Sequence, residues 1–287
     1  MFKRMVVYTQ YLLPKRLITL IAGWLAESRR PWLKNLLIKG FMKRYHIDMS
    51  EAVIQNPLDY PTFNDFFTRK LDMSKRPFVQ SKYDIASPAD GTIVQIGEIR
   101  HHKLLQAKHQ YFKLQSLLGD DAELTYQFSE GAFATIYLAP HNYHRVHMPV
   151  DGTLVKTIFV PGSLFSVNND TIASVPHLYS RNERLICVFN SAAGDFAVVL
   201  VGAMIVGSIQ TAWMREPVRS NKIVTTIFND DTFLPKGSEL GHFKLGSTVI
   251  LLTGKHTAIW LASRPPGSVI KTGQLLGKLC LKSNITA

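Results

Sequence analysis

The sequence is poor in cysteine and has no long uninterrupted hydrophobic stretch. Its 287 residues include only Cys187 and Cys280, which lie in apolar segments without C-x-x-C spacing. Neither a structural zinc site nor a disulfide framework is indicated, and a reducing compartment is the simpler interpretation. The apolar run over residues 17–26 falls well short of the roughly 20 residues that span a bilayer. No small-x-small cleavage site follows it, so we expect neither a membrane-spanning segment nor a targeting peptide.

Acidic residues are scarce in the first sixth of the chain. Up to His46, ten Lys and Arg residues accompany one acidic residue, Glu27, in a chain of formal charge +12. Such a segment suits an anionic partner, which is either nucleic acid or a membrane surface.

The residues between these charges favour the membrane. Apolar side chains recur at helical spacing, at Leu17, Leu20, Ile21, Trp24 and Leu25. Arms that bind nucleic acid rarely carry such a face, so we expect no nucleic-acid partner. We predict helices near residues 4–12, 15–28 and 31–46 that lie on an anionic membrane surface. The alternative is a helical cap that buries the same face against the protein's own core.

The rest of the chain divides into a connector and a β-rich region. Residues 48–86 contain one short predicted helix, which Thr62 caps while Asp65 closes a capping box. After Ser87, short β-type runs alternate with glycine, proline and polar turns. The predicted strands are Thr92–Ile99, Phe133–Leu138, Thr153–Val160, Arg184–Phe189, Phe196–Val201, Ile205–Trp213 and Thr248–Thr253. We therefore expect an α+β, mainly β chain with helices over 1–47, a connector over 48–86 and a β catalytic domain over 87–287.

Two internal near-repeats lie within the β region. Residues 88–93 (PADGTI) are echoed by residues 149–154 (PVDGTL), and residues 237–241 (GSELG) by residues 273–277 (GQLLG). Such paired turn-plus-strand units resemble the half-motifs of lipoyl and biotinyl domains. They predict a barrel-sandwich-like β core with quasi-symmetric halves, a likeness that concerns the fold alone.

A Gly-Ser peptide bond precedes the last predicted strand. Gly246 lacks a Cβ and leaves its carbonyl accessible, and Ser247 supplies a hydroxyl. Serine is a weak nucleophile that needs a base and a group to orient that base. Asp90 and His147, in separate segments, are candidates for these roles. Taken singly, each has an ordinary interpretation: an Asx turn, a core histidine, and a serine after a glycine turn.

Six ordered motifs in this chain resemble those of phosphatidylserine decarboxylases, from the N-terminal helices to about residue 280. The motifs are Thr62-Phe63-Asn64-Asp65-Phe66-Phe67, Pro88-Ala89-Asp90-Gly91, Tyr143-His144-Arg145-Val146-His147-Met148-Pro149, Phe165-Ser166-Val167-Asn168, Arg181-Asn182-Glu183-Arg184 and Leu245-Gly246-Ser247-Thr248.

This resemblance implies that the first reaction is on the protein itself. Asp90 orients His147, His147 deprotonates Ser247, and the chain is cleaved between Gly246 and Ser247. The products are a β chain (1–246) and an α chain (247–287), which form a heterodimer that can oligomerise further. Ser247 becomes a pyruvoyl group, the covalent cofactor. Its ketone forms a Schiff base with phosphatidylserine and acts as the electron sink for loss of CO2, which yields phosphatidylethanolamine.

The resemblance also implies roles for residues around this centre. His144 assists decarboxylation or protonation, and Ser166 and Asn168 line the headgroup pocket unless they form only a polar turn between strands. In a regular strand His144 and His147 would face opposite ways, so we expect a turn or bulge between them. No metal is expected, because prolines disfavour the helix that would align His141, His144 and His147. Some members of the family have Asp where this chain has Asn142, so an acidic role at that position does not carry over to this chain. The implied location is the cell membrane, peripheral, on the cytoplasmic side.

Two other classes of function stay open. An interfacial serine hydrolase would use the same three residues on lipid esters, although the chain has no G-x-S-x-G motif and a hydrolase would remain uncleaved. A non-catalytic membrane adaptor would use the lipoyl-like core alone. Arg181, Arg184 and Lys244 are candidates for contacts with a substrate carboxylate or phosphate, with plain surface solvation as the alternative.

Overall fold

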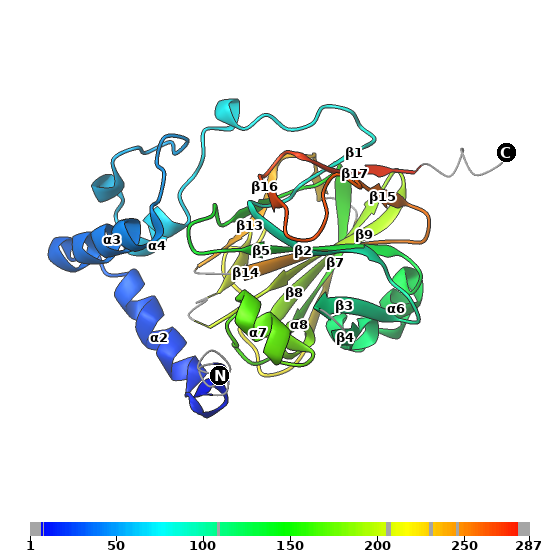
Figure 1. Cartoon of the computed structure of the whole chain (residues 1–287), viewed down its shortest axis with the longest axis horizontal. Coiled ribbons are helices and arrows are strands. Elements are labelled where there is room, and N and C mark those ends of the chain that lie inside the picture. The colour runs from blue at the N-terminus through cyan, green and yellow to red at the C-terminus, as the bar shows by residue number, and fades with distance from the viewer. Residues whose placement is uncertain are drawn as a thin grey trace.

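A computed structural model describes residues 7, 9–107, 110–204, 208–229, 232–244 and 247–280 (Figure 1). Its α-helices are α2 (Lys15–Ala26), α3 (Pro31–Tyr45), α4 (Phe63–Phe67), α5 (Leu114–Leu117), α6 (Ala122–Phe128), α7 (Asn169–Ser174) and α8 (Leu178–Arg181). Residues 9–12 are also helical. Short 3-10 helices cover Pro57–Asp59 and Met73–Lys75.

The strands come almost entirely after residue 83. They are β1 (Asp84–Ala86), β2 (Gly91–Glu98), β3 (Lys103–Ala107), β4 (Gln110–Lys113), β5 (Ala132–Leu138), β6 (Arg145–His147), β7 (Gly152–Val160), β8 (Arg184–Ser191), β9 (Gly194–Val201), β10 (Ile209–Thr211), β11 (Val224–Ile227), β12 (Phe233–Leu234), β13 (Glu239–Phe243), β14 (Ser247–Thr253), β15 (Ala258–Trp260), β16 (Val269–Ile270) and β17 (Leu275–Leu279). The predicted strand over residues 205–213 contains β10, and its first three residues lie outside the described residues. The mainly β composition with N-terminal helices is confirmed.

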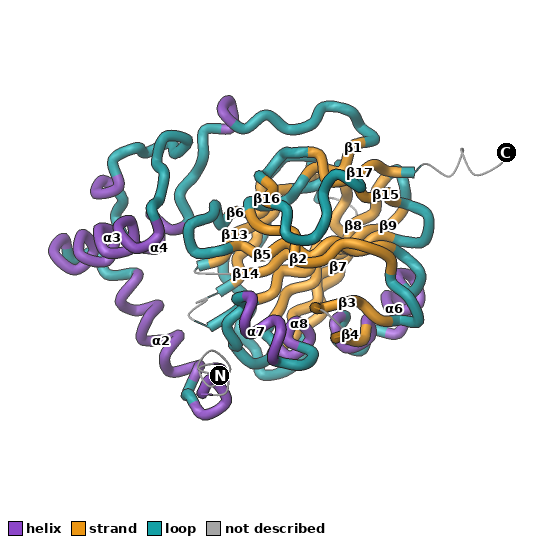
Figure 2. The backbone as a smooth tube through the Cα atoms, viewed as in Figure 1, coloured by secondary structure: helices purple, strands orange, loops and turns teal. Residues whose placement is uncertain are grey.

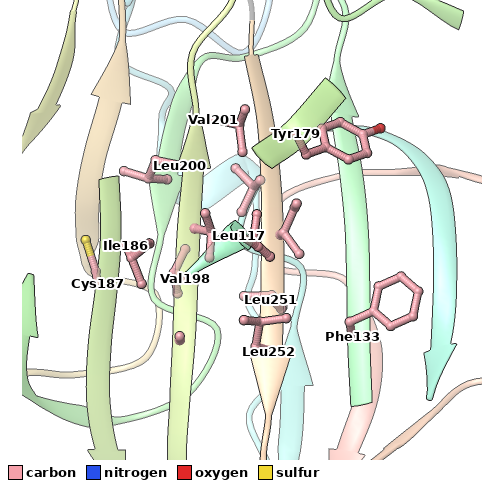
Figure 3. Packing of buried hydrophobic residues seen from close by; sticks show 14 of the residues in the cluster. Leu117, Phe133, Tyr179, Ile186, Cys187, Val198, Leu200, Val201, Leu251 and Leu252 are labelled. Carbon is pink, nitrogen blue, oxygen red and sulfur yellow. The ribbon is translucent and has the colours of Figure 1, made fainter. Parts of the chain in front are cut away.

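One large antiparallel sheet forms the body of the protein. Its strand order is β11-β7-β8-β9-β14-β5-β2-β16, and β12 also pairs with β7. Figure 2 shows the strands of the protein in orange, with the central strands β5, β14, β8 and β9 labelled. Every residue of β14 is buried. The continuous apolar runs of β8, β9 and β14 reflect this central position, because a strand covered on both faces does not need polar residues at alternate positions. Figure 3 shows part of the resulting core, in which Ile186, Val198 and Leu251 stand on the neighbouring strands β8, β9 and β14.

The two sequence repeats form matched halves of the structure. β2 pairs with β16 as β7 pairs with β12, while β1 pairs with β17 as β6 pairs with β13. The connecting turns match in hydrogen bonding. Thr272 N donates to Asp90 Oδ1 at 2.8 Å, and Lys236 N donates to Asp151 Oδ1 at 2.7 Å. Asp90 and Asp151 therefore occupy equivalent turns.

A phenylalanine lies against the equivalent glycines of both halves. Gly237 and Gly273 adopt φ of +84° and +86°, and a Cβ on either would meet the ring of Phe78 at 3.3 or 3.1 Å. Positive φ and this close approach explain why both positions require glycine. The expected barrel-sandwich core is not confirmed, since the described strands form open sheets and no closed barrel.

The N-terminal helices α2 and α3 extend from the β body (Figure 1). Pro31 begins α3, where a missing N–H has no consequence. The apolar side chains of α2 face solvent: Leu17, Leu20, Ile21 and Trp24 are 51–74% exposed. The helical-cap alternative requires these side chains to be buried against the protein's own core, and they are not. None of the helices that the structure describes is long and apolar enough to cross a membrane.

Helix α4 is anchored as its sequence predicts. Thr62 Oγ1 accepts a hydrogen bond from Asp65 N at 3.0 Å, which confirms the N-cap. Phe63, Phe66 and Phe67 are buried and lie around Phe41 of α3 with ring centroids 5.3–6.3 Å apart. This cluster joins α4 to the N-terminal helices.

Candidate active site

Ser247 begins β14, at the boundary between two sheets. The preceding strand, β13, belongs to the three-stranded sheet β10-β13-β6, and β14 lies in the centre of the large sheet. Strand β13 ends at Phe243, so the chain passes from one sheet to the other between Phe243 and Ser247. Ser247 is fully buried, and its hydroxyl has no hydrogen-bond partner among the described residues. The other half of the predicted cleavage site, Gly246, lies outside the described residues, as does Leu245.

His147 lies in β6 and is held at both ring nitrogens. Nδ1 is 2.8 Å from the carbonyl oxygen of Gly237, and Nε2 is 2.9 Å from the hydroxyl of Tyr143. A carbonyl can only accept, so Nδ1 carries the proton and Nε2 accepts from Tyr143. Burial lowers the pKa of His147, and the bond to Gly237 and the charge of Glu239 offset part of this effect. The ring is therefore neutral near pH 7 and has the properties of a base.

Asp90 is buried beside this histidine but bonds elsewhere. Its Oδ1 accepts hydrogen bonds from Arg76 Nη1 at 2.7 Å and from the backbone N–H of Thr272, and its Oδ2 accepts from Arg76 Nη2 at 3.1 Å. Among the described contacts, no hydrogen bond joins Asp90 to His147. The two are connected through the backbone, since His147 N donates to Pro88 O at 2.8 Å. The Asp90 carboxylate also acts through space, because its charge raises the pKa of His147 against the effect of burial.

His144 is fully buried just before β6. Its ring stacks on Phe67 of α4, with centroids 4.1 Å apart and an interplanar angle of 24°. Nε2 donates to Ala139 O at 3.2 Å, and Nδ1 has no partner among the described residues. Burial, followed by the charge of Arg69, lowers the pKa of His144 to about 3. His144 is thus neutral, with an unused ring nitrogen.

Backbone contacts place His144 close to the cleavage segment. Ala139 follows Leu138, the residue that pairs with Ser247 across β5 and β14. On the other side, Phe243 N donates to His144 O at 3.1 Å. The register shift at β6 lies in the partner strand β13, between Glu239 and Gly241, and not between His144 and His147, where a turn or bulge was expected.

The loop that contains Ser166 and Asn168 uses its polar groups internally. Asn168 caps α7 by accepting from Thr171 N at 2.9 Å, and its amide donates to Ser166 Oγ at 3.0 Å. The backbone N–H of Ser166 donates to Gln10 Oε1 at 3.0 Å. These contacts are those of a polar turn, and Gln10 places the N-terminal segment over it.

The cationic candidates are also engaged. Arg184 donates to the carbonyl oxygens of Ser116, Leu117, Ser180 and Asn182, and burial lowers its pKa to about 10. Lys244 pairs with Glu27 at 2.7 Å. Arg181 lies over the rings of Tyr11 and Phe165.

The described residues contain no group of three or more His, Cys, Asp or Glu side chains that could hold a metal ion. His141 is exposed while His144 and His147 are buried. Asn142 closes the turn before them, where its Oδ1 accepts from Ala139 N at 2.8 Å.

Three contacts of this site were not predicted from the sequence. Tyr143 and the Gly237 carbonyl hold His147, and Arg76 holds Asp90. Tyr143 lies within one of the family motifs, and Gly237 lies within one of the internal repeats, both of which were identified from the sequence. Arg76, in the connector, carries no such signal.

A serine hydroxyl that is buried without a partner and two buried, neutral histidines are side chains of the kinds that enzymes use in catalysis. A family model described as phosphatidylserine decarboxylase matches residues 63–278, and a second, described as PSD, matches residues 5–46. The phosphatidylserine decarboxylase proenzyme of Ectopseudomonas mendocina is 47% identical over 284 residues, which is 96% of this chain and 99% of that protein. The proenzyme of Bordetella avium is 47% identical over 274 residues, or 93% and 92% of the two chains. The chain belongs to the phosphatidylserine decarboxylase family, whose members are carboxy-lyases.

Proposed function

We propose that this chain is a proenzyme that cleaves itself between Gly246 and Ser247 and then converts phosphatidylserine to phosphatidylethanolamine and CO2. The observation that carries the proposal is the buried, unpartnered hydroxyl of Ser247 at the start of β14. A buried polar group without a partner is costly, and a catalytic role is one explanation for its presence. The β chain comprises residues 1–246 and the α chain residues 247–287.

In this self-cleavage, His147 acts as the base. Its ring is neutral, and its Nδ1–H is fixed by Gly237 O, which leaves Nε2 as the basic nitrogen. Tyr143 occupies Nε2 in this structure, so its hydroxyl must turn away or pass the proton between Ser247 and His147. Asp90 favours the protonated ring through its charge, while Arg76 and Thr272 N hold its carboxylate in place. The Ser247 oxygen attacks the Gly246 carbonyl, the peptide C–N bond breaks as the acyl group moves from nitrogen to oxygen, and the freed amine takes up the proton. Elimination then releases the Gly246 carboxylate and leaves dehydroalanine at position 247, and hydrolysis of dehydroalanine releases ammonia and gives the pyruvoyl group.

A pyruvoyl group formed from Ser247 fits this position. The side chain is enclosed and makes no competing hydrogen bond with described residues. Such a group supplies a carbonyl electron sink for decarboxylation at an amino acid's α-carbon. The role of holding or delivering the proton at that carbon is assigned to His144, and its neutral ring and unpartnered Nδ1 support this assignment. No metal takes part in this proposal.

The N-terminal helices are assigned to the membrane that contains the lipid. Their exposed apolar side chains lie among basic residues, a combination that binds anionic bilayers without crossing them. The protein is then peripheral, on the cytoplasmic side of the cell membrane. Residues 1–47 form the membrane-binding part, 48–86 the connector and 87–287 the catalytic part. The likeness of the two β halves to lipoyl and biotinyl half-motifs is part of this proposal as well.

A denaturing gel with three variants tests these roles. Ser247→Ala stays a single chain and is inactive. His147→Ala accumulates the uncleaved precursor, whereas His144→Ala matures into two chains but decarboxylates poorly. Circular dichroism shows that each variant is folded. If folded His144→Ala also remains uncleaved, His144 belongs to the cleavage step; if folded His147→Ala cleaves at the wild-type rate, His147 is not the base.

A further inference from the structure

Arg69 is a buried arginine without a counter-ion. It follows α4 and is 5% exposed, yet it forms no ion pair with a described carboxylate. Its Nε and Nη1 have no hydrogen-bond partner among the described residues. Only Nη2 bonds, at 3.4 Å from His141 O, and the guanidinium lies 5.9 Å from the ring centroid of Phe66. Two of its three nitrogens therefore remain free to bind.

The other buried or half-buried arginines of this part of the protein have hydrogen-bond partners. Arg76 binds Glu51 and Asp90, and Arg145 donates to both oxygens of Glu239 at 2.6 and 2.8 Å. Arg184 donates to four backbone carbonyls. Leaving a buried charged group unpaired is among the more costly features a fold can contain. A vacant buried guanidinium therefore indicates an anion that the protein binds in use.

The position of Arg69 connects it with the candidate active site. Phe67, two residues earlier, stacks on His144. The charge of Arg69 helps to lower the pKa of His144. Burial lowers the pKa of Arg69 itself, and Tyr60, Asp90 and Tyr143 offset part of this effect. Its guanidinium and the unpartnered Nδ1 of His144 thus lie in the same buried region.

We infer that Arg69 binds the phosphodiester of the phospholipid substrate with its free N–H groups. This inference rests on the proposed function. The planar guanidinium has the geometry for two parallel hydrogen bonds to phosphate oxygens, which a lysine cannot reproduce. Arg69 would fix the headgroup while chemistry proceeds at the α-carbon, and so acts by binding.

The other anion of the headgroup, the carboxylate, is a poorer match. Its charge leaves that carbon when CO2 departs, so a guanidinium bound to it would stabilise the ground state more than the transition state and slow the reaction. The phosphodiester keeps its charge throughout and can be bound equally in both states. Phe66 of α4 lies beside the Arg69 guanidinium and Phe67 of α4 stacks on His144, so this inference requires α4 to move aside when the headgroup binds.

The test compares Arg69→Met and Arg69→Lys with wild type, using phosphatidylserine in detergent micelles. Arg69→Met removes the charge and keeps much of the volume. We expect it to mature into two chains, to raise KM about 10- to 100-fold, as loss of a charged hydrogen-bonded contact does, and to change kcat little. Arg69→Lys should recover only part of the loss. Arg100→Met, the same change at an exposed arginine with 78% side-chain exposure, serves as the matched control.

Two probes without an amine separate the anions. Glycerol 3-phosphate should inhibit Arg69→Met at least ~10-fold less well than wild type, and glycerate should inhibit both proteins equally. A thermal shift with glycerol 3-phosphate on uncleaved Ser247→Ala, lost in Ser247→Ala/Arg69→Met, gives a readout independent of activity. The inference is overturned if KM is unchanged, if only glycerate inhibition weakens, or if neither Arg69 variant folds and cleaves. An inactive or uncleaved wild type would contradict the proposed function instead.

Discussion

Replacing Asp90 by asparagine distinguishes the structural work of this residue from its effect on cleavage. The Asp90 carboxylate accepts two hydrogen bonds from Arg76 and one from Thr272 N in a buried site. Burial alone would lower the pKa of Arg76, but Glu51 and Asp90 raise it, which shows how strongly the site favours the charged guanidinium. The Asp90→Asn variant keeps an acceptor for Thr272 N but loses the negative charge.

The internal repeat supplies a control for this substitution. Asp151 accepts from Lys236 N in the equivalent turn, yet it is exposed and has no ion pair among the described residues. Breaking a buried ion pair costs about 3–5 kcal/mol. Arg76 keeps Glu51, so we expect a loss of about 2–3 kcal/mol for Asp90→Asn and less than about 1 kcal/mol for Asp151→Asn.

Both changes are best measured by denaturant unfolding in the Ser247→Ala background, where every chain is uncleaved. Cleavage is then followed with Ser247 restored, at a temperature where both proteins are folded. We expect Asp90→Asn to cleave slowly, because His147 loses a charge that favours its protonated form, and Asp151→Asn to cleave normally. Equal losses of stability in the two variants would refute the assignment of a buried Asp90–Arg76 pair. Normal cleavage by folded Asp90→Asn would refute its action on His147.

Three further outcomes follow from the structure. The pKa of His144 is lower in the folded chain than in the unfolded chain, so its contribution to the free energy of unfolding is fully present above the unfolded pKa near 6.5. This contribution is lost as pH falls toward 3, by about 1.4 kcal/mol per pH unit. In the Ser247→Ala background, His144→Gln should therefore make the free energy of unfolding in urea depend less on pH between about pH 7 and 5, and an unchanged dependence would contradict this expectation. Trp24→Ser should weaken sedimentation with anionic vesicles while leaving the melting temperature unchanged, because Trp24 is 74% exposed; equal sedimentation would show that α2 is not the anchor. Arg184→Met should destabilise the uncleaved chain by about 3 kcal/mol or more, since four carbonyls lose their donor, and a change below about 1 kcal/mol would contradict a structural role.

Local patterns in the sequence predicted local structure well. The apolar run at Thr248–Thr253 is β14, the Thr62 cap begins α4, and the repeats around Asp90 and Asp151 form equivalent turns. Each of these features depends on residues close in the chain or on an alternation that burial imposes directly. The apolar face of α2 was predictable for the same reason, because it depends on the spacing of residues within one helix.

Contacts between distant segments were not predictable in the same way. The partner of His147 Nδ1 is a backbone carbonyl 90 residues away, and a carbonyl has no sequence signature. Arg76 reaches Asp90 from the connector, and no pattern in the sequence indicated this contact. Arg69 shows the same limit, because only the fold reveals that a guanidinium is buried and unpaired.

Intact-mass spectrometry of the purified wild-type protein tests the central claim most directly. The account predicts two chains, residues 1–246 and 247–287. The smaller should lack an N-terminal amine, react with carbonyl reagents, and be absent from Ser247→Ala. A single uncleaved chain that decarboxylates phosphatidylserine at full rate would contradict it.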